Sequence, residues 1–151
     1  CVEVQTDRCR RAVDCGATNA VGPDQLQSTT TSIDVVLECS GSPSAFESVW
    51  PLLAIGGRII CVGSVFPAPP ASVALEQLVR RCVTVRGVHN YAPRHLLQAV
   101  EFLSQQHRRF PFAGIVGGWH PLSDVASAFE RAGDPSALRV GVTPSPTDAH
   151  R

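Results

Sequence analysis

The stretch Ile33–Ser64, IDVVLECSGSPSAFESVWPLLAIGGRIICVGS, decides the fold of this chain. Residues 33–39, and again residues 59–62, form apolar, β-branched runs with too few polar positions for a wet face. This pattern is typical of parallel strands buried on both sides. Between the runs, apolar residues at three- and four-residue spacing predict a helix whose single stripe covers the sheet. The stripe comprises Phe46, Val49, Trp50 and Leu53. We expect Gly56-Gly57 to end this helix.

The two predicted strands and the helix between them form a right-handed crossover unit of a parallel sheet. Both strands end in loops of small residues, Ser40-Gly41-Ser42 and Gly63-Ser64. Since ligands bind at the carboxyl edge of such a sheet, we expect a binding site at these loops.

The rest of the chain continues the alternation of strands and helices. Further helices are expected at 6–15, 74–81, 93–107 and 122–132, and further strands at 19–21, 83–88 and 138–142. Residues 110–118 are apolar, contain glycine breaks and depart from this rhythm. The order of elements predicts an α/β fold with a doubly wound parallel sheet.

The composition disfavours several classes of function. The 151 residues include 13 basic and 13 acidic side chains, so no excess charge favours nucleic acid or a membrane surface as a partner. No apolar run reaches the roughly 20 residues of a membrane-spanning helix. The six cysteines form no CxxC pair, so we expect buried, reduced thiols and a cytoplasmic location.

The N-terminal residues suggest half of a dinucleotide site. The chain begins at Cys1 and contains no methionine, so we expect a piece of a longer product. Glu3 stands where a strand ends, and in dinucleotide-binding folds an acid there accepts hydrogen bonds from the adenosine ribose. A carboxylate also repels a 2′-phosphate, which favours NAD over NADP. The phosphate loop GxGxxG is absent, and we expect it upstream of Glu3.

Short motifs recur along the chain in a specific order. They are Glu3 with Arg8, Arg11-Ala12, Gly16-Ala17, Asp34–Gly41, Gly56–Ile59, Val62-Gly63, Arg86–Tyr91 and Leu138–Val140. Together they resemble the medium-chain, zinc-type alcohol dehydrogenases over about residues 1–144, most nearly the threonine/sorbitol dehydrogenase-like branch. The resemblance implies a partial Rossmann sheet that lacks its first strand. It also implies a C-terminal segment that returns to the catalytic domain.

The resemblance implies contacts with both halves of NAD. Glu3 would bind the adenosine ribose with Arg8 beside it, and Arg139 would reach the pyrophosphate. Residues 39–41 would pass under the cofactor, and residues 62–64 and 89–90 would approach the nicotinamide. The residues of this second group are Cys39, Ser40, Gly41, Val62, Gly63, Ser64, His89 and Asn90.

The zinc ligands and the proton relay of that family are not found in this sequence, so the zinc of the parent enzyme would be bound outside it. We therefore expect the cofactor-binding part of an NAD-dependent dehydrogenase that acts on a small-molecule alcohol and is inactive as a fragment. The parent would be a homodimer or homotetramer, paired through strand 83–88. The expected division is a partial dinucleotide-binding domain at 1–91, a bridging helix at 92–107, a C-terminal part of the catalytic domain at 108–144 and a disordered tail at 145–151.

Three alternatives stay open. A zinc-free, quinone-reductase-like oxidoreductase would use NADPH, which Glu3 disfavours. A SAM-dependent methyltransferase also carries an acid after its second strand, but its sheet typically finishes with an antiparallel hairpin. A truncated product would have no independent function.

Overall fold

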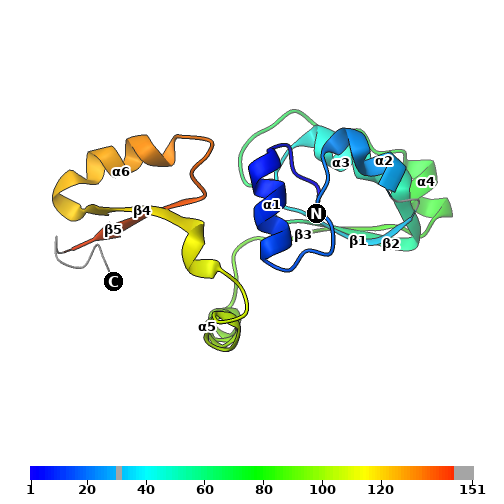
Figure 1. Ribbon diagram of the computed structural model, residues 1–151. Helices are drawn as coiled ribbons and strands as arrows, with labels where there is room; N and C mark the ends of the chain where they lie inside the picture. The colour runs from blue at the N-terminus through cyan, green and yellow to red at the C-terminus, as the bar shows by residue number, and fades with distance from the viewer. Residues whose placement is uncertain (30–31, 145–151) are drawn as a thin grey trace. The chain divides into compact units, whose positions relative to one another are not determined.

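A computed structural model of the chain describes residues 1–29 and 32–144 (Figure 1). The contacts divide the chain into two compact units. The first contains residues 1–13 and 17–96, and the second contains residues 14–16 and the described residues from 97 onward. Each unit has its own parallel sheet.

Most of the predicted elements are present, with short 3₁₀ turns between some of them, but a strand forms at Val116–Pro121 where none was predicted, and the strand predicted at 19–21 does not form. The helices are α1 (Thr6–Asp14), α2 (Leu26–Thr29), α3 (Pro43–Val49), α4 (Leu75–Arg80), α5 (Pro93–Gln106) and α6 (Val125–Ala132). The strands are β1 (Ile33–Glu38), β2 (Leu53–Cys61), β3 (Thr84–Gly87), β4 (Val116–Pro121) and β5 (Arg139–Thr143). The 3₁₀ turns are η1 (Pro23–Gln25), η2 (Trp50–Leu52), η3 (Phe112–Ile115) and η4 (Leu122–Asp124).

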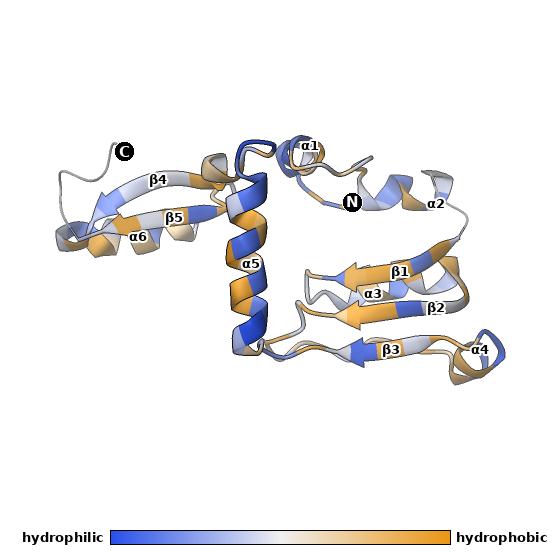
Figure 2. Cartoon of the chain, turned by 90° about the horizontal axis from the view of Figure 1, so that it is seen from below, coloured by the Kyte–Doolittle hydropathy of each residue, from blue (hydrophilic) through white to orange (hydrophobic). Residues whose placement is uncertain are grey.

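The sheet of the first unit has three strands in the order β1-β2-β3, all parallel. The strands lie side by side, and their hydropathy is high along much of β1 and β2 (Figure 2). Helix α3 connects β1 to β2 and α4 connects β2 to β3. The predicted α/β fold with a partial parallel sheet is therefore confirmed.

The core of the first unit lies between α3 and one face of this sheet. Its buried residues are Phe46, Trp50, Leu53, Ile59 and Val83. The rings of Phe46 and Trp50 stack with their centroids 5.8 Å apart. Burial of one such apolar side chain contributes about 1.5–3 kcal/mol, so these contacts hold the helix on the sheet.

The prediction that residues 33–39 are buried on both faces is wrong in this structure. Side chains alternate along β1, so Val36 and Glu38 face inward while Val35 and Leu37 are 49% and 65% exposed. The apolar run was a poor guide because it cannot tell a covered face from an apolar face that no described element covers.

The prediction that Gly56-Gly57 ends the helix is also wrong. Helix α3 ends at Val49, and the chain continues as the 3₁₀ turn Trp50–Leu52, where Pro51 has no backbone N–H to donate to the preceding helical turn. Strand β2 already begins at Leu53, so the glycine pair lies inside it. Gly56 adopts a φ of +76°, where the pairing shifts from Ile33 opposite Leu53 to Val35 opposite Arg58.

Two further segments differ from expectation. The strand predicted at 19–21 is reduced to one parallel bridge between Val2 and Val21. No strand was predicted at 110–118, because glycines interrupt its apolar pattern. This segment contains the start of β4, which pairs in parallel with β5. The pairing between strands of the described residues is parallel throughout, which counts against the methyltransferase hairpin.

Among residues 1–29 and 32–144, no helix combines the length and the apolar character that crossing a membrane requires. The tail predicted at 145–151 lies outside the described residues.

Candidate ligand edge of the parallel sheet

The three strands of the first unit end at one edge. Glu38, Cys61 and Gly87 occupy equivalent positions, since Glu38 pairs with Cys61 and Cys61 pairs with Gly87. The loops that follow are therefore neighbours. They contain the residues predicted to pass under the cofactor, Cys39, Ser40 and Gly41, and those predicted to approach the nicotinamide, Val62, Gly63, Ser64, His89 and Asn90.

Glu38 organises the first two loops. Its side-chain carboxylate accepts hydrogen bonds from Ser40 N at 2.8 Å, Ser40 Oγ at 2.5 Å and Gly41 N at 2.9 Å. Ser64 Oγ donates to the same carboxylate at 3.3 Å from the second loop. The backbone carbonyl of Glu38 accepts from Val62 N at 2.8 Å and Gly63 N at 2.9 Å. One residue thus bonds to both loops through two separate groups.

Gly41 and Gly63 bring the same loops into close contact. A Cβ on Gly63 would overlap the backbone of Cys39 and lie 2.6 Å from Gly41 N. A Cβ on Gly41 would lie 2.6 Å from Gly63 O, and Gly41 has a φ of +72° that side chains other than glycine rarely adopt. The glycines that the sequence places in both loops are therefore required by the loop-to-loop packing.

The electrostatics of the edge centre on Glu38. Burial raises the pKa of its carboxyl, but the hydrogen bonds from Ser40, Gly41 and Ser64 outweigh burial and bring the pKa below its ordinary value. Glu38 is therefore ionised at neutral pH. For Cys61, burial first and then the nearby Glu38 charge raise the pKa of the thiol.

Glu38 was not among the residues singled out from the sequence. The signal that could have found it is a carboxylate at the last position of an otherwise apolar strand, directly before a Ser-Gly loop. A charge at such a position needs hydrogen-bond donors close by, and the next loop residues provide them.

Glu3 lies next to the Val2–Val21 bridge in the same unit. Its backbone N–H donates to Val21 O at 3.0 Å, and its carboxylate accepts from Gln5 N at 3.0 Å. The groove between this bridge and β1 has a volume of about 460 Å³ and includes Val2, Val21 and Leu37 among its lining. Arg8 lies on α1, within the first turns after Glu3.

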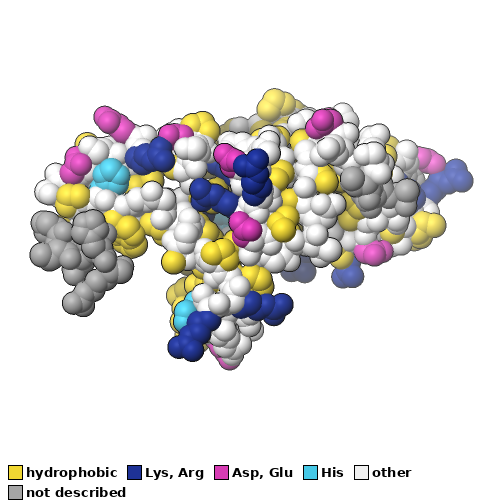
Figure 3. Space-filling view, in the orientation of Figure 1, with side chains coloured by type: hydrophobic (Ala, Val, Ile, Leu, Met, Phe, Trp, Pro, Cys, Tyr) yellow, Lys and Arg dark blue, Asp and Glu magenta, His cyan; other side chains and the backbone are white. Residues whose placement is uncertain are grey.

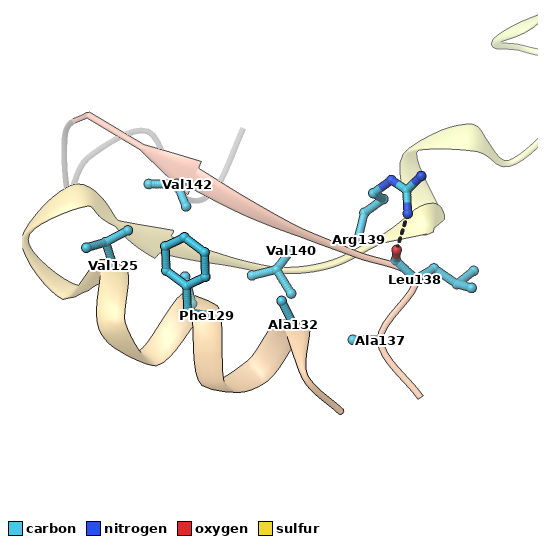
Figure 4. Close-up of a pocket in the computed structure, with 9 residues that line it drawn as sticks. Val125, Phe129, Ala132, Ala137, Leu138, Arg139, Val140 and Val142 are labelled. Carbon is cyan, nitrogen blue, oxygen red and sulfur yellow. Dashed lines mark hydrogen bonds between the residues drawn. The ribbon is translucent and has the colours of Figure 1, made fainter. Parts of the chain in front are cut away.

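Arg139 begins β5 in the second unit, and its Nη1 donates to the backbone carbonyl of Leu138 at 2.7 Å (Figure 4). Together with Phe129 and Val140 it borders a mainly apolar groove of about 390 Å³ between α6 and β5. The predicted contact between Arg139 and a pyrophosphate stays a prediction.

The cysteines differ from expectation. All six are free thiols, but Cys1, Cys39 and Cys82 are exposed rather than buried. Within the described residues, no three His, Cys, Asp or Glu side chains gather where they could hold a metal ion. On the face shown in Figure 3, acidic and basic side chains are interspersed with hydrophobic ones.

The parallel crossover sheet and its glycine-bearing carboxyl edge define a Rossmann-like α/β protein. Residues 1–105 match the family described as zinc-binding dehydrogenases, and the chain belongs to that family. It is 28% identical to the D-altritol 5-dehydrogenase of Agrobacterium fabrum over 140 residues, which cover 91% of this chain and 41% of the relative. It is 30% identical to the L-threonine 3-dehydrogenase of Pectobacterium atrosepticum over 95 residues, 58% of this chain and 26% of the relative.

Solved structures agree on the fold. An alcohol dehydrogenase from Thermotoga maritima superposes with a TM-score of 0.88 at 20% identity, over 95% of this chain and 42% of that one. The L-idonate 5-dehydrogenase of Escherichia coli gives a TM-score of 0.76 at 22% identity, over 94% of this chain and 41% of that one. The chain thus spans less than half the length of these relatives.

Proposed function

We propose that this chain is the cofactor-binding portion of an NAD-dependent, zinc-type alcohol dehydrogenase-like oxidoreductase. The reaction of the whole enzyme is hydride transfer from a small-molecule alcohol to NAD. The observation that carries the proposal is the shared carboxyl edge, where the loops after β1, β2 and β3 lie side by side in a chain of the zinc-binding dehydrogenase family. The names of the relatives, two polyol or sugar-acid dehydrogenases and a threonine dehydrogenase, favour a secondary alcohol as the substrate class.

The residues of the edge fit a dinucleotide. The backbone of Ser40-Gly41 and Gly63-Ser64 lies at the carboxyl ends of β1 and β2, where a parallel sheet binds ligands. His89 and Asn90 are exposed after β3, and Asn90 adopts a left-handed φ of +57°. Bound NAD would accept the hydride at its nicotinamide ring, and the role of these loops is to hold and orient that ring.

Glu3 supports NAD over NADP. Its carboxylate stands after the Val2–Val21 bridge, and a negative charge there repels a 2′-phosphate. This favours the NAD enzyme over the quinone-reductase-like alternative that uses NADPH. The preference depends on charge alone, so it is testable with an isosteric substitution.

The residues described here do not fit a zinc ion, because they form no cluster of candidate ligands. We propose that the metal of the whole enzyme is bound outside this chain. By the same reasoning, the chain alone has no dehydrogenase activity.

The wider assembly follows from the same proposal. Residues 1–91 form the partial dinucleotide-binding domain, 92–107 the bridging helix and 108–144 a part of the catalytic domain. Strand β3 is exposed along its length and pairs with β2 on one side, so it offers an edge to the same strand of a second subunit in a homodimer or homotetramer. The enzyme is proposed to be cytoplasmic.

The test is titration of the chain with NADH and with NADPH, followed by amide chemical shifts. We expect NADH to shift the amides of residues 39–41 and 62–64, and NADPH to bind more weakly. Glu3→Gln should remove the preference, whereas Glu76→Gln, on exposed α4, should keep it. A preference for NADPH, or shifts that avoid this edge, would refute the proposal.

A further inference from the structure

Glu38 is a charged side chain in a place where charge is costly. It is only 5% exposed, although the loops around it are open to solvent. A buried carboxylate is tolerated when hydrogen-bond donors replace water around it. Here the donors are the backbone and hydroxyl of Ser40, the backbone of Gly41 and the hydroxyl of Ser64.

These donors come from two loops that are far apart in sequence. Ser64 lies 26 residues from Glu38, and its hydrogen bond joins the loop after β2 to the loop after β1. The backbone carbonyl of Glu38 adds two bonds, from Val62 N and Gly63 N. The contact of Gly41 with Gly63 leaves no room for a side chain between the loops, so the loops lie close enough for these bonds to join them.

We propose that Glu38 is a positioning residue, which sets the relative placement of the Ser40-Gly41 and Gly63-Ser64 backbone for the nicotinamide half of the cofactor. This inference rests on the proposed function. Glu38 does not itself touch the cofactor, because the donors of its own loop network enclose its carboxylate. It acts by fixing the direction of the loop N–H and C=O groups that do.

The charge of Glu38 is the property that matters. A carboxylate accepts hydrogen bonds from all four donor groups, whereas a glutamine of the same size would turn an NH₂ donor toward the N–H groups of Ser40 or Gly41. Cys61 is a titratable group close to Glu38. Burial and the charge of Glu38 raise the pKa of its thiol, so Cys61 stays uncharged at neutral pH. Thus Glu38→Gln perturbs the loops without changing the shape of the side chain.

The experiment measures binding of the two halves of the cofactor separately. The probes are nicotinamide mononucleotide and adenosine, each titrated into the chain while amide chemical shifts are recorded. We expect Glu38→Gln to weaken the binding of nicotinamide mononucleotide by about tenfold, which is the order of magnitude for a lost hydrogen bond to a charged group. The affinity for adenosine should stay unchanged. Ser64→Ala removes only the side-chain hydrogen bond between Glu38 and the second loop and should weaken the binding of nicotinamide mononucleotide to a smaller extent.

The matched control is Glu47→Gln. Glu47 lies on α3 and its carboxylate accepts one bond from Ser72 N at 2.8 Å, away from the two loops. This control should leave both affinities unchanged. It separates the effect of losing a carboxylate in this unit from the effect of losing the one that joins the loops.

The outcomes separate this inference from the proposed function. Suppose that the unsubstituted chain binds both probes, and that neither Glu38→Gln nor Ser64→Ala changes the affinity for nicotinamide mononucleotide. The inference is then wrong while the proposed function stands. If Glu38→Gln weakens the binding of adenosine equally, Glu38 has a general structural role and the inference is wrong. The inference is also wrong if the unsubstituted chain binds adenosine alone. If the unsubstituted chain binds neither probe, both the proposed function and the inference are wrong. If Glu38→Gln does not fold, Ser64→Ala decides alone by the same criterion.

Discussion

Gly63 offers the sharpest test of the loop packing, through the substitution Gly63→Ala. The added Cβ would overlap the backbone of Cys39 and stand 2.6 Å from Gly41 N. Ordinary contacts between such atoms are about 3.5 Å or longer, so the two loops must separate by roughly 1 Å. Backbone atoms surround the site, so no side chain can rotate away to make room.

The cost has two parts. Overpacking against rigid surroundings costs about 1–3 kcal/mol. Separation of the loops also strains the bond from Gly63 N to Glu38 O, which is 2.9 Å long and is worth about 1 kcal/mol. We therefore expect Gly63→Ala to lower the free energy of unfolding of the first unit by about 2–4 kcal/mol.

Gly87→Ala is the matched control. Gly87 lies in β3 of the same sheet, and a Cβ there meets no atom within 4 Å. Its effect should stay within about 0.5 kcal/mol, as for other open positions.

Urea unfolding, followed by tryptophan fluorescence, measures both variants. Trp50 is 7% exposed and reports on the first unit, whereas Trp119 lies in the second and is 51% exposed. All proteins would carry Trp119→Phe, so that the signal comes from Trp50 alone. Equal stability of Gly63→Ala and Gly87→Ala would refute the packing argument.

Two further predictions concern the core and the buried carboxylate. Ile59→Ala should lower the free energy of unfolding of the first unit by about 2–5 kcal/mol because Ile59 is 0% exposed. The control Ile55→Ala, at a position 82% exposed, should change it little. Similar losses for both variants in urea unfolding would contradict the assigned core. The pKa of Glu38 is lower in the folded than in the unfolded chain, where it is about 4.3. At a pH above the unfolded pKa, ionised Glu38 therefore stabilises the fold. This stabilisation is lost as the pH falls through the folded pKa. Unfolding measured from neutral to acidic pH should therefore show a smaller decline for Glu38→Gln than for the parent, and an unchanged pH slope would argue against a hydrogen-bonded, ionised Glu38.

Much of the candidate site could be predicted from the sequence because it depends on local patterns. The apolar runs and small-residue loops predicted two parallel strands, the connecting helix and a shared carboxyl edge, and the structure has all three. Glu3 lies directly after the Val2–Val21 bridge, and its binding of a ribose stays a prediction.

Errors arose where distant residues decide. The start of β2 at Leu53 depends on its pairing with Ile33, and β4 depends on β5, more than 15 residues further along the chain, so periodicity within either segment was not enough. The exposed face of β1 shows the same limit, since an apolar sequence does not reveal which of its faces is covered.

Apart from β4 and the strand predicted at 19–21, the sequence by itself determined the order of strands and helices, because hydrophobic spacing and glycines act over a few residues. It also determined that the loops after β1 and β2 consist of small residues. Only the tertiary structure decided that Glu38 is buried between those loops and bonded to both, because Ser64 is brought to it by strand pairing over 26 residues. A carboxylate alone in the sequence has no such partner, and the parallel register of β1 and β2 provides it.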